Sequence, residues 1–231
     1  MDKYRLIQRI EEYAPPDRQE PWDCSGWLVE TENKNIEKIM LCLTVTNDII
    51  NQASEQNCDI IISHHPLFFV PFEYRHTDIY CAHTNLDITE GGTTDALIDK
   101  LKLSQYKFAH NSEEQQFLRY ISYKTDIEKF VKLLKTISPN MRYSNPCGIK
   151  EFNKIAFCSG SGSEFIKEAC KNGADALVTG DLKFHTALES PIAIFDIGHF
   201  ESEIMVLEVF EKLINTDAKV VFAKEKSPFN Y

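Results

Sequence analysis

Short apolar runs alternate with amphipathic segments along most of the chain. In residues 38–65, KIMLCLTV and CDIIISHH are rich in Val, Ile and Leu, and the segment between them carries Ile49, Ile50 and Ala53 at helical spacing. Further along, PIAIFDIGH and AKVVFAK flank FESEIMVLEVFEKLINT, for which the pattern predicts one long amphipathic helix. Buried strands that alternate with helices indicate βαβ units, so we expect a mainly parallel sheet covered on both faces.

One strand–helix–strand unit occurs twice. Residues 38–65 align with residues 154–181 at an offset of 116 positions, with six identities in 28 positions and no gap. The identities include Asp59 with Asp175, and the order of the predicted elements is the same in both segments. The sequence therefore predicts an internal repeat.

The repeat suggests a chain built from two α/β halves, residues 1–115 and 116–231, which could also form one intertwined unit. The N-terminal segment is predicted to be a helix that ends at Pro15 and Pro16. Residues 115–144 are predicted to form a strand, a helix and a strand, and to serve as the connection or as part of the second half. The expected fold class is α/β, with two mainly parallel sheets flanked by helices.

Composition narrows the possible partners. The chain has 231 residues, 43% of them hydrophobic, but no apolar run long enough for a membrane helix and no signal-peptide pattern at its N-terminus. The net charge is −10 and no basic stripe is present, which argues against nucleic acid. The seven cysteines are odd in number and form no CxxC pair, which favours reduced thiols in a cytoplasmic protein.

Histidines and carboxylates gather at the predicted strand ends. Because ligands in open α/β sheets lie beyond the carboxyl ends of the strands, these residues are the candidates for a site. Five of the seven histidines lie there, whereas His76 and His110 fall on loops. The polar residues at these ends are His64, His65, His83, Asn85, Asp87, Asp181, His185, Asp196, His199 and Glu203.

The chemistry that suits this set is metal ligation. Each residue alone could be an ordinary surface or cap residue, but imidazole and carboxylate ligands together suit Zn, Fe, Mn, Co or Ni. His199 and Glu203 lie one helical turn apart, so both would project from the same helix face. Pro66 favours a turn after His64 and His65, which would let the two rings reach different ions.

Weaker features leave alternatives open. CSGSGS could bind an anion at a helix N-terminus, or could be a tight turn with Ser163 as the N-cap. His83 and His185 could orient ligands, transfer protons or contact substrate. Asp181 and Asp196 could be turn residues or could orient ligands.

Ordered motifs along the chain resemble the YbgI-like, or NIF-three-like, family of GTP cyclohydrolase 1 type 2 homologues. These motifs are WDCSGW, SHHPLFF, AHTNLD followed by GG, CSGSGS, TGDLKFH and DIGHFESE. The resemblance spans nearly the whole chain and corresponds to the short form of the family, without an inserted middle domain. Two departures are Cys24, where the family usually has asparagine, and Thr44, where it tends to have aspartate.

The resemblance implies a NIF-three-like fold, a ring-shaped homohexamer and two divalent metal ions per subunit. The implied ligands are His64, His65, Asp87, His199 and Glu203, and His83 and His185 are the candidate catalytic residues. The implied function is that of a metal-dependent hydrolase resembling GTP cyclohydrolase 1 type 2, acting on a purine nucleotide ring or in a related hydrolysis. The alternative is a non-catalytic metal-binding or regulatory hexamer that stores or delivers metal to a partner.

Overall fold

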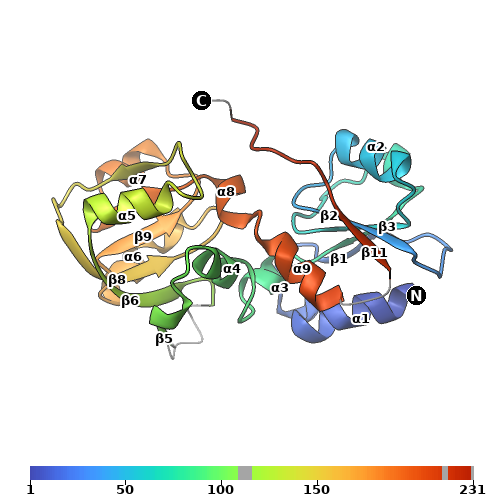
Figure 1. The fold of residues 1–231 in the computed structure, drawn as a ribbon, viewed down its shortest axis with the longest axis horizontal. Coiled ribbons are helices and arrows are strands. Elements are labelled where there is room, and N and C mark those ends of the chain that lie inside the picture. The colour runs from blue at the N-terminus through green and yellow to red at the C-terminus, as the bar shows by residue number, and fades with distance from the viewer. Residues whose placement is uncertain (109–115, 215–217, 230–231) are drawn as a thin grey trace. The chain divides into compact units, whose positions relative to one another are not determined.

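The computed structural model describes residues 1–108, 116–214 and 218–229, and it divides into two compact units (Figure 1). The first unit comprises Met1–Gly92 and Val206–Lys226, and the second comprises Thr93–Met205 and Ser227–Tyr231. His110 and the predicted boundary at residue 115 lie outside the described residues. Each unit holds one sheet flanked by helices, which confirms the predicted α/β class.

The first unit is built on a five-stranded sheet in the order β1-β4-β3-β2-β11. All neighbouring pairs are parallel except β1 with β4. Its elements are α1 (Lys3–Tyr13), η1 (Pro16–Arg18), β1 (Gly26–Val29), β2 (Lys38–Cys42), α2 (Asn47–Glu55), β3 (Ile60–Ser63), η2 (Phe72–Tyr74), β4 (Asp78–Cys81), α3 (Thr84–Asp87), α9 (Val206–Ile214) and β11 (Lys219–Phe222).

Helices cover both faces of this sheet, as expected for parallel strands (Figure 1). On one face, Met40 and Ile61 pack in one cluster with Ile49 and Ala53 of α2. On the other face, α9 contacts both β2 and α1. The four residues of β3 are fully buried, so the first side chains beyond its end are the first that can serve a site.

The second unit is built on a six-stranded sheet in the order β5-β6-β8-β9-β10-β7. The central strands β8, β9 and β10 are parallel, and the remaining pairs are antiparallel. Its elements are α4 (Thr93–Lys100), η3 (Ser104–Tyr106), β5 (Lys107–Phe108), β6 (Arg119–Asp126), α5 (Ile127–Leu134), β7 (Arg142–Ser144), β8 (Glu151–Phe157), η4 (Ser163–Phe165), α6 (Ile166–Lys171), β9 (Ala176–Thr179), α7 (Phe184–Leu188), β10 (Ala193–Asp196) and α8 (His199–Glu203).

The internal repeat is visible in a shared backbone anchor. In the first unit, Asp59 Oδ2 accepts the backbone N–H groups of Glu37 and Lys38 at 2.8 and 2.9 Å. In the second unit, Asp175 Oδ2 accepts the backbone N–H groups of Asn153 and Lys154 at 2.7 and 3.0 Å. In both, the carboxylate before the second strand ties the start of that strand to the first, so the predicted repeat is present in the structure.

The two compact units exchange segments of the chain. Helix α4 belongs to the second unit, because Leu97 and Ile98 join its core. After residue 205 the chain returns to the first unit, where β11 pairs with β2. The compact units therefore divide the chain at points other than residues 1–115 and 116–231.

The prediction of one long helix after His199 is wrong, because α8 ends at Glu203 and α9 begins at Val206. Met205 packs in the core of the second unit, whereas Val206 belongs to the first. The apolar pattern continues across the break because each side of it serves a different core. Periodicity alone does not show which core a residue joins.

Candidate metal centre

Three histidines meet at the carboxyl ends of β3 and β4 in the first unit. His64 and His65 follow β3, and His83 lies directly before α3, two residues after β4. Because β3 and β4 are parallel neighbours, their carboxyl ends lie at the same sheet edge. The ring centroid of His64 lies 5.2 Å from those of His65 and His83, and the centroids of His65 and His83 are 5.6 Å apart. Each ring offers a nitrogen within 4.8 Å of the others, so this group could hold a metal ion.

Each of these rings is anchored through Nδ1. His64 Nδ1 lies 3.0 Å from the carbonyl oxygen of Ala82, His65 Nδ1 lies 2.6 Å from Thr44 Oγ1, and His83 Nδ1 lies 3.0 Å from Asp23 Oδ1. Metal-binding histidines commonly donate one ring N–H to such a partner, which orients the ring and leaves the other nitrogen for the ion.

The approach of Asp87 to His64 points to a cation. The carbonyl of Ala82 only accepts, so His64 donates from Nδ1, and in the neutral ring Nε2 then carries a lone pair. This buried nitrogen lies 3.4 Å from Asp87 Oδ1. Two atoms that each lie about 2.1 Å from a tetrahedral ion are separated by about 3.4 Å. The pair therefore has the spacing of two ligands to one ion.

Asp23 is a buried carboxylate beside His83. Its side chain is fully buried. Burial alone would raise the pKa of this carboxyl, but hydrogen bonds from His83 and Thr84 hold the pKa well below its usual range. Asp23 is therefore ionised and can only accept, which places the shared proton on His83 Nδ1.

The second unit brings a histidine and two carboxylates together at the ends of β9 and β10. His199 opens α8, and Glu203 lies one turn later on the same helix. His199 Nδ1 lies 2.7 Å from Asp181 Oδ2, and His199 Nε2 lies 3.0 Å from Glu203 Oε2. Burial lowers the pKa of His199, but the hydrogen bonds to Glu203 and Asp181 outweigh that effect and raise the pKa to about 9. The predicted placement of His199 and Glu203 on one helix face is present in the structure.

The CSGSGS segment makes room for this group. Gly160 has φ +65°, and a Cβ on it would lie 2.2 Å from Glu203 Oε1 and 3.5 Å from His199 Nε2. Only glycine lets the backbone approach these side chains so closely. The N–H groups of Gly160 and Gly162 already donate to the hydroxyls of Ser202 and Thr179.

These bonds favour the turn interpretation of CSGSGS over an anion site. The N-cap of η4 is Gly162, which has no side chain to form a capping hydrogen bond. The prediction of Ser163 as N-cap is therefore wrong. Ser163 is instead the first residue of that short helix.

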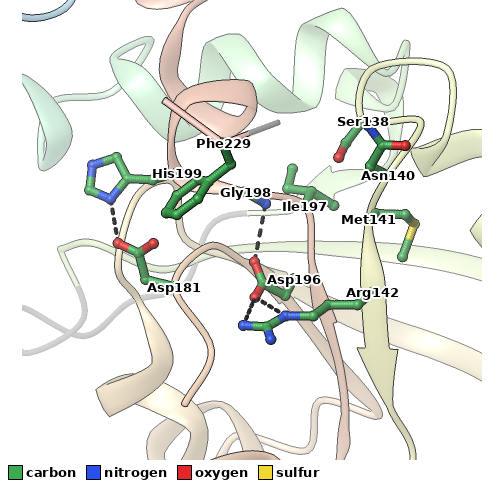
Figure 2. A pocket seen from close by; sticks show the side chains of 10 residues that line it. All are labelled: Ser138, Asn140, Met141, Arg142, Asp181, Asp196, Ile197, Gly198, His199 and Phe229. Carbon is green, nitrogen blue, oxygen red and sulfur yellow. Dashed lines mark hydrogen bonds and ion pairs between the residues drawn. The ribbon is translucent and has the colours of Figure 1, made fainter. Parts of the chain in front are cut away.

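A pocket of about 260 Å³ opens beside His199 within the second unit (Figure 2). Asp196 lines this pocket, and its Oδ2 accepts from Arg142 Nε at 2.8 Å and from the backbone N–H of Leu182 at 3.1 Å. Arg142 also donates to the carbonyl of Leu182. Phe229, Asp181 and His199 also line the pocket, and Asp181 and His199 lie on the opposite side of the view from Arg142 (Figure 2).

The sequence of the chain matches the Duf34/NIF3 (NGG1p interacting factor 3) family over residues 1–79 and 74–228. A curated relative, the GTP cyclohydrolase 1 type 2 homolog of Clostridium perfringens, is 32% identical and is covered over 98% of each chain. The homolog of the same name from Campylobacter jejuni is 30% identical over 96% of each chain. The chain belongs to the Duf34/NIF3 family.

Solved structures agree with this assignment. Reduced HcgD from Methanocaldococcus jannaschii has a TM-score of 0.82 and 26% identity, with 96% of this chain and 97% of that chain covered. The protein ybgI, described as of unknown function, has a TM-score of 0.85 and 20% identity, with coverage of 99% and 100%. The predicted resemblance to the NIF-three-like family and the predicted fold are therefore confirmed.

Sequence reasoning did not identify two residues that contact the histidine rings. Asp23 lies within WDCSGW and pairs with His83, and Thr44 pairs with His65. Thr44 stands where the family resemblance implied an aspartate, so here a hydroxyl takes the place expected of a carboxylate. The position of Asp23 inside the WDCSGW motif indicated that the residue could matter for the site. The sequence pattern around Asp23 did not indicate its contact with His83, which lies 60 positions later.

The remaining candidates divide clearly. Asp181 orients His199, whereas Asp196 anchors Arg142 and the turn at Gly198. His185 is exposed on α7, with its ring 5.3 Å from that of Phe184. The structure thus shows a contact of Asp181 with the ring of His199 and a surface position for His185.

The donor sets fit a divalent metal. The first unit supplies imidazoles with anchored Nδ1 atoms and the carboxylate of Asp87, and the second supplies His199 with Glu203 under a glycine that leaves them space. Nitrogen and oxygen ligands of this kind suit Zn, Fe, Mn, Co or Ni. A metal that takes His199 must displace its proton, as metals do when they bind imidazole.

Gly160→Ala is expected to lower the metal content of the purified protein. The new Cβ would collide with Glu203 Oε1, and the left-handed backbone adds a stability cost of about 1–2 kcal/mol. Gly148→Ala is the matched control, because Gly148 has φ +64° with nothing within 4 Å of the added Cβ. Denaturant unfolding should show a similar cost for both variants, and elemental analysis should show metal loss only for Gly160→Ala. Equal metal content in the two variants would contradict the assignment.

Proposed function

We propose that this chain is a metal-dependent hydrolase that binds two divalent ions through His64, His65, Asp87, His199 and Glu203. The observation that carries the proposal is the anchoring of imidazoles by Nδ1, with a carboxylate close to Nε2 of both His64 and His199. For His64, whose Nδ1 faces the carbonyl of Ala82, the approach of Asp87 to Nε2 is the spacing of two ligands to one ion. The family names of the relatives, GTP cyclohydrolase 1 type 2 homologs, support hydrolysis as the reaction class.

The division of labour among the residues follows from their contacts. Bound divalent ions would supply Lewis acidity and activate a water molecule for hydrolysis. Thr44 and Asp181 hold the rings of His65 and His199 in place. His83, which contacts both His64 and His65 through ring faces and edges, would transfer the proton during the reaction. His185 stays a second candidate for proton transfer, although its side chain is exposed.

One feature of the first unit supports a planar substrate such as a purine nucleotide. The exposed ring of Trp22 lies 6.0 Å from His83 and 6.4 Å from the exposed ring of Phe68, which offers a stacking surface for a base. Opening of a purine ring or a related hydrolysis is the reaction that we propose for this substrate.

The metal content of single variants tests the ligand set. Wild-type protein purified without chelators should carry two divalent ions per chain, and Glu203→Ala should lose at least one because a carboxylate ligand is gone. Glu201→Ala is the matched control on the same helix and should retain both ions. Elemental analysis that gives Glu203→Ala the same content as wild type would rule out this assignment.

The hydrolase proposal predicts turnover that depends on the ligands. Metal-loaded protein, incubated with GTP and a panel of nucleotides and phosphoesters, should release a hydrolysis product that chromatography separates. His65→Ala and Glu203→Ala should each abolish that product, since both remove ligands. Full metal loading without turnover of any compound would instead support the alternative of a metal-storing or metal-delivering protein.

We also propose that the chain forms a homohexamer in the cytoplasm, as the family resemblance implies. The apolar residues of α9 do not support this proposal, because Val206, Leu207 and Phe210 are already buried in the chain and α9 contacts α1 and β2. Among the residues that the structure describes, every helix is too short or too polar to cross a membrane.

Light scattering at micromolar concentration should give about six times the chain mass of 26.6 kDa. A stable species at the mass of a single chain would contradict the hexamer.

A further inference from the structure

Hydrogen bonds hold the backbone of His83 in place. Its backbone N–H lies 3.1 Å from Ser25 Oγ and 3.0 Å from Asn85 Oδ1. The amide of Asn85 in turn donates to the carbonyl of Ala14. These bonds fix the backbone from which the ring projects, so the orientation of the ring depends on the contact at Nδ1.

That contact is made by Asp23, whose two oxygens are already occupied by donors. Oδ1 accepts the backbone N–H of Cys24 at 2.7 Å, and Oδ2 accepts the backbone N–H of Thr84 at 3.0 Å. The hydroxyls of Ser25 and Thr84 also donate to Oδ2. A carboxylate that accepts backbone N–H groups at both oxygens is ionised, so it accepts a hydrogen bond from the ring and has no proton to donate to it.

We infer that Asp23 is the positioning residue of His83, holding its proton on Nδ1 and leaving Nε2 as the basic atom of a ring that contacts both His64 and His65. The inference deepens the proposed function and rests on it, because a proton-transferring imidazole needs its basic nitrogen on the reacting side. Asp23 acts only through His83.

The second unit repeats this pairing. Asp181 Oδ2 lies 2.7 Å from His199 Nδ1, as Asp23 Oδ1 lies 3.0 Å from His83 Nδ1. The offset of 116 residues that relates the two repeats also relates His83 to His199. The strand registers match less closely, since Ile60 pairs with Asp78 whereas Ala176 pairs with Ala193, which is a shift of one residue. Each unit thus holds one histidine whose Nδ1 is bound by a carboxylate from a distant segment.

A cap for α3 is the simpler role for Asp23, and it makes a different prediction. Capping needs only the contacts with Thr84, at the first residue of that helix, and leaves the proton on His83 unspecified. A positioning role requires that loss of the carboxylate change which ring nitrogen carries the proton. Asparagine at this site can donate its amide proton to Nδ1 and so favour the other tautomer.

Nuclear magnetic resonance of the full-length protein, labelled with ¹⁵N in histidine and loaded with zinc, tests this directly. The His83 signals are assigned by their loss in His83→Gln. In wild type, Nδ1 of His83 should be protonated and Nε2 unprotonated, and in Asp23→Asn the proton should move to Nε2. Asp59→Asn is the matched control, because Asp59 also accepts two backbone N–H groups but pairs with no histidine, and it should leave the tautomer unchanged.

Kinetics supply the second measurement. Asp23→Asn should lower kcat about 100-fold with KM within about 2-fold of wild type, at full zinc content, because a positioned proton-transferring group contributes at least this much. A wild-type spectrum with the proton of His83 on Nε2 would overturn the inference without any variant, and so would an unchanged tautomer in folded Asp23→Asn. Absence of turnover in wild type would refute the hydrolase proposal, while the tautomer would still decide the role of Asp23.

Discussion

Both units depend on the complete burial of their central parallel strands. The residues of β3, β4, β9 and β10 are all buried, so no polar side chain along them can reach a ligand without a cost in desolvation. Chemistry can begin only where these strands end, and the parallel arrangement brings the ends of neighbouring strands to one edge. The histidines and carboxylates of the candidate site lie at those edges, where the buried strands end.

A second constraint acts on the rings themselves. An imidazole has two nitrogens, and a hydrogen bond from the protein to one of them fixes the orientation and the protonation of the other. This chain uses a different partner each time: a backbone carbonyl for His64, a hydroxyl for His65, and carboxylates for His83 and His199. The partners differ in charge, so rings of the same chemical type differ in how strongly they attract a cation or a proton. The Nδ1 partner of His65 is the neutral hydroxyl of Thr44, whereas the Nδ1 partners of His83 and His199 are carboxylates.

The sequence predicts the fold class and the positions of the candidate ligands because both follow from local pattern. Apolar runs mark β3 and β9, and the first polar residues after them, such as His64 and Asp181, stand out without knowledge of the fold. What pattern could not supply is the pairing of residues far apart in the chain. Asp23 meets His83 only because β1 lies beside β4, and α8 separates from α9 only because Met205 and Val206 join different cores. Such contacts depend on tertiary packing, which periodicity does not record.

The return of the chain to its first unit has a consequence for synthesis on the ribosome. Strand β2 lies between β3 and β11, yet β11 is made from residues 219–222, near the end of the chain. As the N-terminal segments emerge first, β2 is an open sheet edge until nearly the whole polypeptide has been translated, and α1 has no α9 to pack against. An open edge of apolar strands invites pairing with other chains. The first unit to be synthesised is therefore the last to be completed, and a truncated product would expose the apolar strand that the finished protein buries.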